Sequence, residues 1–328
     1  MKTLAISTLD ERGLVRAVDA ADDAAADITR EDWLAQRRTG LGGSDAPVVC
    51  GVSKYKSPLT LWAELRGDVE SDFDECEAAH WGHVLEPAIA EEFERRSKRR
   101  VHRWPQTISV HHPDVIWQRC TPDAMQWCRG ERNSAGVVQI KTTGAHLAHE
   151  WIEDDYEPGK LLEFPESHRV QITHEMNVVG ATWGTIVVLI GGQKMLWCDV
   201  EYDFELGTAI TAAEELFWQC VQTGERPALD GSESTAATLK KLHPQDSGAT
   251  VMLGAEVVEI DREFVDIKER LSALELRKKH LETLLRGHIG DATFGVVPGG
   301  VTYSLKAQTR KPYVVEEATF RVLRRKAA

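Results

Sequence analysis

The stretch Thr121-Pro122-Asp123, followed further along by Val137-Val138-Gln139-Ile140-Lys141, decides how we interpret this sequence. The run before Lys141 is typical of a buried strand, and Lys141 ends it. Asp123 follows another short apolar run. A hairpin of two adjacent strands would therefore bring together the carboxylate of Asp123, the amide oxygen of Gln139 and the ammonium of Lys141.

A carboxylate, an amide oxygen and an ammonium in one place suit the hydrolysis of phosphodiesters. Mg²⁺ prefers oxygen ligands in near-octahedral geometry, usually one or two carboxylates together with waters and phosphate oxygens. The ion activates a water and neutralises charge on the leaving phosphate, and a nearby lysine orients or deprotonates that water. Glu86, an Arg37/Ser44 pair and Gln171 lie on either side of these residues in the sequence. The sequence therefore indicates a metal-dependent nuclease site.

The composition is that of a globular protein. The 328 residues are 42% hydrophobic, which is enough to bury a sizeable core in one large domain or in one domain with an appendage. No apolar run is long enough to span a membrane, and Met1 to Arg12 lacks the pattern of a secretory signal. The six cysteines show no C-x-x-C spacing, which argues against a zinc ribbon or a disulfide framework. We expect a cytoplasmic protein with reduced thiols.

The charge is unevenly distributed. A formal net charge of -13 argues against indiscriminate coating of nucleic acid, since such binding is driven mainly by Lys and Arg. Two stretches, Arg95 to Arg103 and Lys306 to Lys326, are nevertheless basic. Local binding of DNA along these stretches is therefore one interpretation of them. The alternative for the first stretch is a solvated helix end, where cations are favourable.

Hydrophobic periodicity predicts a mixed α/β core. Helices are expected from Thr29 to Gly40, after Ser44-Asp45, from Ser57-Pro58, from His80 to Ser97, from Val170 to Val179 and from Glu214 to Val221. Strands are expected at Thr107 to Val110, Val115 to Gln118, Val137 to Lys141, Thr185 to Ile190 and Met195 to Val200. Glu86 lies near the buried side of its helix, where a carboxylate needs a partner or a metal. The helix start after Ser44-Asp45 is a natural seat for a phosphate.

Composition shifts predict four segments along the chain. Residues 1–28 read as a flexible leader, 29–229 as the core domain, 230–253 as a linker and 254–328 as a C-terminal module. In that module an alternating four-three spacing of apolar residues from Ile260 to Leu285 predicts a long amphipathic helix. The helix either packs on its own chain or forms an intermolecular coiled coil, and its short length favours the first. A hairpin is expected from Phe294 to Leu305.

Several motifs that are weak singly become specific in their order. They are Trp33-x-x-x-Arg37 with Gly43-Ser44-Asp45, the stretch Gly51 to Trp62, Trp81-Gly82-x-x-x-Glu86-Pro87, Pro122-Asp123, Ile140-Lys141-Thr142, Gln171 and Phe217-Trp218. With them, residues 33–227 resemble the YqaJ-type viral recombinases and the phage lambda exonuclease, within the PD-(D/E)XK nuclease superfamily. The resemblance implies an α/β restriction-endonuclease-like core with a central mixed sheet flanked by helices. The C-terminal helix and β-hairpin would form an appendage outside the match.

The resemblance also implies roles for individual residues. Glu86 and Asp123 match metal ligands, the backbone carbonyl of Ile140 matches a further ligand, and Lys141 matches the lysine that positions the attacking water. The catalytic set would be Glu86, Asp123, Gln139 and Lys141, and the metal ligands Glu86, Asp123, Gln139 and Ile140, with Mg²⁺ as cofactor and Mn²⁺ as a substitute. The residues matching the pocket for a DNA 5′-phosphate and its groove are Arg37, Ser44, Thr121 and Gln171.

Gln139 departs from the family pattern, which has an acid at this position. Its amide oxygen can still contact Mg²⁺, but it brings no negative charge, and metal affinity should be weaker. We favour retained activity because Asp123, Glu86 and Lys141 are all present.

The implied function is Mg²⁺-dependent 5′-to-3′ exonuclease digestion of linear double-stranded DNA, leaving 3′ overhangs for strand annealing in phage-type recombination. One alternative is a catalytically weakened protein that binds DNA ends, which Gln139 motivates. Another is a restriction-type endonuclease, which Arg37 and Ser44 disfavour because they suit a terminal phosphate. The implied partners are double-stranded DNA ends, a single-strand annealing protein and further copies of the chain, as a homo-oligomer in a trimeric ring, without a membrane. The protein would be phage- or prophage-encoded and act in a bacterial cytoplasm.

Overall fold

The structure, a computed structural model, describes residues 11–25, 29–70, 77–128, 134–311, 321 and 325. The chain divides into two compact units, Met1–His243 and Pro244–Ala328. All the predicted site residues lie in the first unit, and each unit is described separately below.

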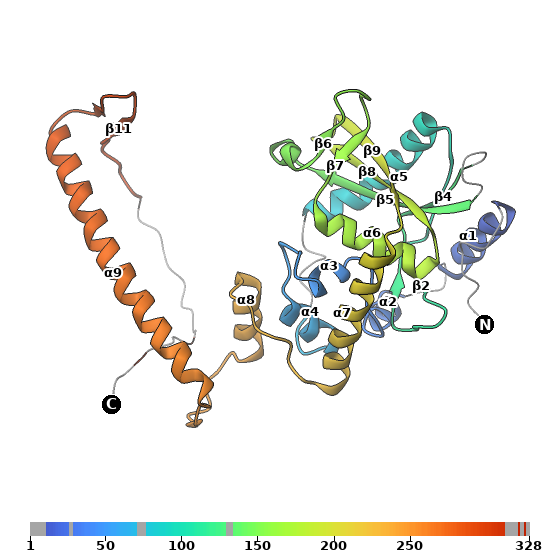
Figure 1. Cartoon of the computed structure of the whole chain (residues 1–328), viewed down its shortest axis with the longest axis horizontal. Coiled ribbons are helices and arrows are strands. Elements are labelled where there is room, and N and C mark those ends of the chain that lie inside the picture. Colours follow the sequence, from blue (N-terminus) through green and yellow to red (C-terminus); the bar gives the residue numbers. More distant parts are fainter. Residues whose placement is uncertain are drawn as a thin grey trace. The chain divides into compact units, whose positions relative to one another are not determined.

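A five-stranded mixed sheet forms the centre of the first unit (Figure 1). Its strands in spatial order are β1 (Arg100–Arg103), β4 (Ala124–Cys128), β5 (Ser134–Thr143), β8 (Trp183–Ile190) and β9 (Lys194–Glu201). β5 and β8 are parallel, and the other neighbours are antiparallel. Parallel neighbours need a crossover, so the chain leaves the sheet after β5 and returns through a helix to β8. The predicted α/β fold with a central mixed sheet is confirmed.

Two helices cover the two faces of this sheet, α5 (Glu77–Ser97) and α6 (Glu166–Val179) (Figure 1). Ile140 of β5 packs in a buried cluster with Phe93 of α5. Val137 packs in a different cluster with Ile172 of α6. Because successive side chains of a strand point to opposite faces, Gln139 and Lys141 share the face of Val137, which α6 covers.

A further group of helices, α3 (Ala46–Val49), α4 (Pro58–Arg66) and α7 (Phe204–Thr223), packs beside α6. They are preceded in the chain by α2 (Arg30–Arg37). Thr29 caps α2 through its hydroxyl, which accepts a hydrogen bond from the Asp32 N–H at 3.2 Å, and Ser57 caps α4 in the same way. Trp62 of α4 and Trp218 of α7 share one buried cluster. The predicted starts of both capped helices are therefore confirmed.

The strands before Asp123 differ from the prediction. Val115 to Gln118 forms a turn rather than a strand, because Ile116 is 77% exposed and Trp117 stacks on Trp218 at 6.3 Å. Of the predicted Thr107 to Val110 strand, only Val110 is extended. The short strands found are β2 (Val110–His111), β3 (Arg119–Cys120), β6 (Ile152–Glu153) and β7 (Leu161–Glu163), with a 3-10 helix over Ala145–Glu150. β1 was not predicted, because its basic sequence lacks an apolar run and lies at the edge of the sheet.

Residues 11–25 do not behave as the loosely attached leader that was predicted. They form α1 (Glu11–Ala25), whose residues Leu14, Val18 and Ala21 are buried. These three side chains belong to the same cluster as Val137 and Ile172. The abundance of Ala and Asp hid a narrow apolar stripe, which tertiary packing converts into a core helix.

We expect Leu14→Ala to destabilise the first unit by about 2–3 kcal/mol. The side chain is fully buried, and removing buried methyl groups costs transfer free energy and leaves a cavity. The measurement is urea unfolding followed by tryptophan fluorescence, with Arg16→Ala on the exposed side of α1 as the control. Equal midpoints for the two variants would show that α1 contributes no stability.

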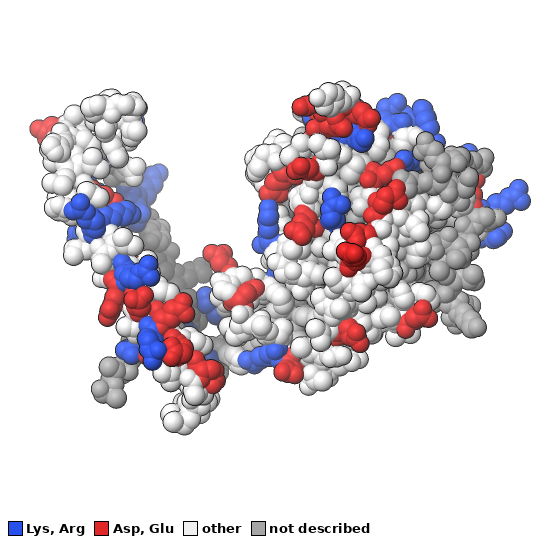
Figure 2. Space-filling model, in the orientation of Figure 1, with Lys and Arg blue, Asp and Glu red and all other residues white. Residues whose placement is uncertain are grey.

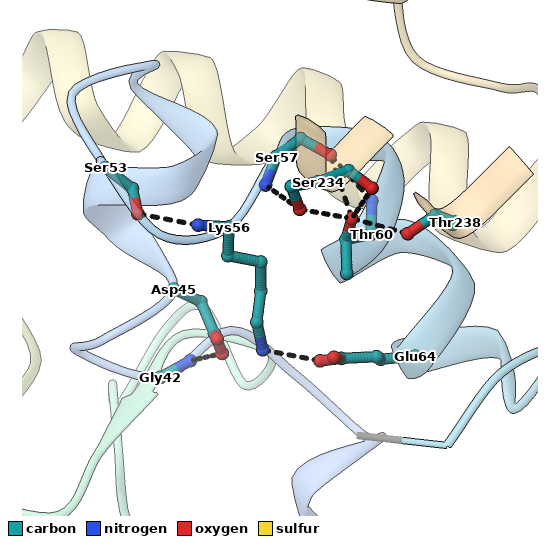
Figure 3. Close-up of polar contacts among 9 residues, drawn as sticks. All are labelled: Gly42, Asp45, Ser53, Lys56, Ser57, Thr60, Glu64, Ser234 and Thr238. Carbon is teal, nitrogen blue, oxygen red and sulfur yellow. Dashed lines mark hydrogen bonds and ion pairs between the residues drawn. The ribbon is translucent and has the colours of Figure 1, made fainter. Parts of the chain in front are cut away.

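The predicted linker also contains an ordered helix, α8 (Glu233–Leu242), which packs on α4 (Figure 3). Ser57 N–H donates to Ser234 Oγ at 3.1 Å, and Thr60 Oγ1 lies 2.8 Å from Ser234 Oγ and 2.7 Å from Thr238 Oγ1. Serine and threonine are common in linkers, so this segment was predicted to be one. In the structure their hydroxyls form hydrogen bonds between α8 and the start of α4. The first unit therefore extends to His243, beyond the predicted end of the core.

The second unit contains α9 (Glu256–Ile289) and a hairpin of β10 (Phe294–Val296) with β11 (Thr302–Ser304). The predicted long helix and hairpin are confirmed. No residue of α9 is buried, and positive and negative side chains are interspersed along it (Figure 2). That the apolar stripe of α9 packs on its own chain, rather than in a coiled coil with another chain, stays a prediction. Across the described ranges, every helix is too short or too polar to cross a membrane.

Candidate active site

The β4–β5 hairpin places Asp123 beside the second half of β5, which continues past Lys141, its predicted end, to Thr143. Ala124 pairs with Val138, so the chain enters β4 next to Gln139 and Ile140. The Ile140 N–H donates a hydrogen bond to Asp123 Oδ2 at 2.6 Å. This bond fixes the carboxylate across the two strands. The strand that pairs with β5 follows Asp123, whereas the sequence predicted a strand before it.

Lys141 reaches Gln171 on α6. Its Nζ donates to Gln171 Oε1 at 3.1 Å, and both side chains are half-buried. The ammonium also acts on Asp123, since its charge opposes the rise in the pKa of that carboxyl. The lysine is therefore held between a strand carboxylate and a helix amide.

Glu86 approaches from the opposite helix, α5. It is 7% exposed and accepts a hydrogen bond from Gln106 Nε2 at 3.1 Å. Burial, together with the charge of Asp123, raises the pKa of Glu86 to about 7. Burial likewise raises the pKa of Asp123, against the opposing effects of Lys141 and the Ile140 N–H. The two carboxylates therefore repel one another in the metal-free protein.

The donors present suit a hard divalent cation. Glu86 and Asp123 offer carboxylate oxygens, Ile140 a backbone carbonyl and Gln139 an amide oxygen, and a cation would relieve the repulsion between the acids. Gln139 is fully buried, and neither of its side-chain polar atoms has a hydrogen-bond partner. Among the described residues, no three His, Cys, Asp or Glu side chains are grouped closely enough to hold a metal ion. The set therefore contains two carboxylates, supplemented by neutral oxygens.

The glycine-rich turn before Ser44 is docked on the chain leading into β3. Leu41 N–H donates to Trp117 O at 2.7 Å, and Arg119 N–H donates to Leu41 O at 3.0 Å. Gly42 N–H donates to Asp45 Oδ2 at 2.9 Å (Figure 3). The helix expected after Ser44-Asp45 is only the single turn α3, with Pro47 in it, so it offers less of a phosphate seat than predicted.

The predicted phosphate residues are distributed around this turn. Arg37 is half-buried at the end of α2, and Ser44 is exposed. Thr121 lies two residues before Asp123, but its hydroxyl is 3.3 Å from Ser109 Oγ and is engaged there. The structure thus brings Glu86, Asp123, Lys141 and Gln171 together, with Arg37 and Ser44 on the adjoining turn.

Residues 32–182 match the YqaJ-like viral recombinase domain, a range that contains Glu86, Asp123, Lys141 and Gln171. The chain is 35% identical over 276 residues to the uncharacterized protein YqaJ of Bacillus subtilis, covering 83% of this chain and 82% of that protein. The chain belongs to the YqaJ family.

Solved structures similar to this YqaJ-family chain include two exonucleases. The alkaline exonuclease LHK-Exo of Laribacter hongkongensis is 16% identical with a TM-score of 0.45, covering 59% of this chain and 93% of that chain. A phage-related exonuclease from Haemophilus somnus is 11% identical with a TM-score of 0.37, covering 57% of this chain and 96% of that chain.

Three of the six Lys and Arg residues between Arg95 and Arg103 of this YqaJ-family chain are paired with acids. Arg95 and Arg96 both bind Glu92, at 2.7 and 2.6 Å. Arg99 makes two bonds with Asp199 on β9, at 2.6 and 2.7 Å. These pairs support the interpretation as a helix end rather than as a DNA track.

Sequence reasoning missed a buried cation, Arg119. It is 3% exposed, and burial lowers its pKa to about 10, although Asp45 opposes this shift. Its guanidinium donates to Thr39 Oγ1 at 3.3 Å, and the charge of Arg37 also acts on it. Two arginines therefore lie near the glycine-rich turn, where the sequence had indicated one. No motif marked Arg119, because its position depends on the docking of the turn.

Three further buried acidic and basic groups of this YqaJ-family chain were missed, all on α6 and α7. They are Glu175, one helical turn after Gln171, and the buried pair His174–Glu214, joined at 2.6 Å. The only sequence signal was the presence of charged residues within otherwise apolar helices.

Proposed function

We propose that this chain is a divalent-metal-dependent exonuclease that digests one strand of linear double-stranded DNA from its 5′ end. The observation that carries the proposal is the meeting of Asp123 and Lys141, from adjacent strands, with Glu86 from α5. Membership of a family described as viral recombinase domains supports it.

Each side chain has a separate task in this proposal. Asp123, Glu86 and the neutral oxygens of Gln139 and Ile140 would hold a divalent ion, which would supply Lewis-acid chemistry to the phosphodiester. Asp123, held by the Ile140 N–H, and Glu86 present the carboxylates that bind it. Lys141, held by Gln171, orients the water for in-line attack. The leaving oxygen departs on the side opposite the water.

The turn near Ser44 supports action at a DNA end. Arg37 provides a half-buried cation beside a backbone turn, Ser44 is exposed on that turn, and the buried Arg119 adds positive charge nearby. Arginine guanidinium groups suit the bidentate recognition of phosphate. A terminal phosphate held there would set the register of the scissile bond. The product would be a 3′ single strand for an annealing protein, and a homo-oligomeric ring, trimeric by resemblance, would keep the enzyme on the duplex.

Gln139 favours a second candidate, a protein that binds DNA ends without cutting them. The buried amide offers an oxygen but no charge for a cation. If this loss were decisive, Arg37 and Ser44 could still hold an end phosphate. Metal-dependent cleavage distinguishes the two candidates.

The test is digestion of a linear duplex that is 5′-phosphorylated and labelled on one strand, with Mg²⁺ or Mn²⁺ titrated. We expect release of nucleotides from 5′ ends, inhibition by EDTA and an intact covalently closed circle in parallel. Cutting of the circle would instead indicate an endonuclease. Binding of ends without release of nucleotides at any metal concentration would contradict the exonuclease and favour the binding protein.

A further inference from the structure

Glu175 on α6 is a buried acid with an unused oxygen. It is 3% exposed, and its Oε1 accepts a hydrogen bond from Gln171 Nε2 at 2.9 Å. Its Oε2 has no hydrogen-bond partner. A buried carboxylate oxygen without a partner costs free energy, so its retention needs an explanation beyond packing.

Glu175 lies on α6, the helix that covers the face of β5 to which Gln139 belongs. Gln139 and Lys141 point to the face of the sheet that α6 covers, and the two polar atoms of Gln139 are also without partners. Burial and, next, the charge of Asp123 raise the pKa of Glu175 to about 7, so the helix carboxylate lies within electrostatic reach of the site. The strand therefore supplies a neutral amide where the adjacent helix supplies a charge.

A short hydrogen-bonded relay connects Glu175 to the lysine. Glu175 Oε1 accepts from the amide nitrogen of Gln171, and the amide oxygen of Gln171 accepts from Lys141 Nζ at 3.1 Å. An ionised carboxylate only accepts hydrogen bonds, so it selects the orientation of the Gln171 amide that turns its oxygen toward Lys141. A glutamine with free rotation would lose this preference.

The glycine-rich turn encloses the same carboxylate. A Cβ at position 43 would lie 2.5 Å from Glu175 Oε1 and 2.9 Å from its Cγ. Gly43 is therefore required for the turn to lie over Glu175. The residue connects the turn next to Ser44 with the relay to Lys141.

We infer that Glu175 is a positioning residue that supplies from α6 the negative charge missing at Gln139 and orients Gln171 toward Lys141. The inference rests on the proposed metal-dependent function. The absence, among the described residues, of three grouped acids agrees with an action through charge and through Gln171 rather than as a direct ligand. Residues of this kind around a metal typically change its affinity 10- to 100-fold.

The test is binding of Mn²⁺ alone to the full chain, measured by isothermal titration calorimetry. We expect Glu175→Gln to weaken binding by about 10- to 100-fold. Glu215→Gln, on an exposed position of α7, should bind as the wild type does. Adding Gln139→Glu to Glu175→Gln should restore affinity to within a few-fold of the wild type, because the charge returns on the strand. Thermal melting without metal should show that Glu175→Gln and the double variant Gln139→Glu/Glu175→Gln are folded.

The outcomes separate this inference from the proposed function. Wild-type chain that binds Mn²⁺ and digests DNA, with unchanged affinity in Glu175→Gln, would overturn the inference alone. Failure of Gln139→Glu to restore affinity would overturn the compensation between strand and helix. A wild type that neither binds Mn²⁺ nor digests DNA would overturn the proposed function, and the inference with it.

Discussion

Asp123→Asn is expected to lower the rate of DNA digestion by about 10³-fold while leaving the first unit folded. Asparagine keeps the shape of the side chain, and its amide oxygen can still accept the Ile140 N–H that now bonds Asp123 at 2.6 Å. The substitution removes one of the two carboxylates offered to the cation and leaves the rest of the set in place. The rate is measured on the labelled linear duplex at saturating Mg²⁺.

Stability should move in the opposite direction from activity. The folded-state pKa of Glu86, raised to about 7 by burial and by Asp123, lies above its ordinary value of 4.5. Ionisation of Glu86 therefore destabilises the metal-free protein progressively as the pH rises from about 4.5 to 7. Removing the Asp123 charge relieves part of this repulsion, so the melting temperature at pH 8 in EDTA should stay constant or rise.

The control for Asp123 is Asp114→Asn, which changes an exposed aspartate of the turn before β3. It should digest DNA at the wild-type rate. A rate for Asp123→Asn within tenfold of the wild type would contradict the role of Asp123. A lower melting temperature would show that the lost rate reports unfolding instead.

The sequence predicted those parts of the fold whose signal is local. The apolar run ending in Lys141, the caps at Thr29 and Ser57 and the spacing of α9 each depend on neighbouring residues, and all appear in the structure. α1 and α8 were missed because what orders them is distant. α1 is buried against the sheet, and α8 is hydrogen-bonded to α4.

The same limit applies to the site: the residues that a local pattern marks were predicted, and those placed by distant elements were not. Asp123 and Lys141 could be placed together because one hairpin joins them. Glu175, Arg119 and the His174–Glu214 pair could not, because each acquires its environment from elements that are remote in sequence. A polar residue inside an apolar helix marks a buried polar contact, but it does not identify the partner.

Glu214→Ala is expected to destabilise the first unit by about 3–5 kcal/mol at pH 7. His174 Nδ1 lies 2.6 Å from Glu214 Oε1, and His174 Nε2 lies 2.9 Å from Arg119 O, so a protonated ring donates to both. Gln118 Nε2 also donates to Glu214 Oε2 at 2.6 Å. Both the histidine and the glutamate are fully shielded from solvent. Removing the carboxylate forces the buried His174 ring to lose its proton and leaves the Gln118 amide without its acceptor.

The pH dependence identifies the ion pair as the cause. Burial lowers the pKa of His174, but the charge and hydrogen bond of Glu214 outweigh it and raise the pKa to about 9, above the ordinary value of 6.5. A raised folded-state pKa contributes stability that is complete below about pH 6.5 and is lost as the pH rises through about 9. The gap in unfolding free energy between wild type and Glu214→Ala should therefore narrow between pH 7 and pH 9.5.

Tryptophan fluorescence makes this measurement specific to the first unit, because all ten tryptophans precede Pro244. Urea unfolding is compared with that of Glu215→Ala, the exposed neighbour on α7, which should change the unfolding free energy by less than about 0.5 kcal/mol. A loss below about 1 kcal/mol for Glu214→Ala would show that the pair contributes little net stability, since desolvation then cancels its attraction. A gap that stays constant to pH 9.5 would show that His174 is neutral in the folded protein, with Glu214 stabilising the core through its hydrogen bond to Gln118 instead.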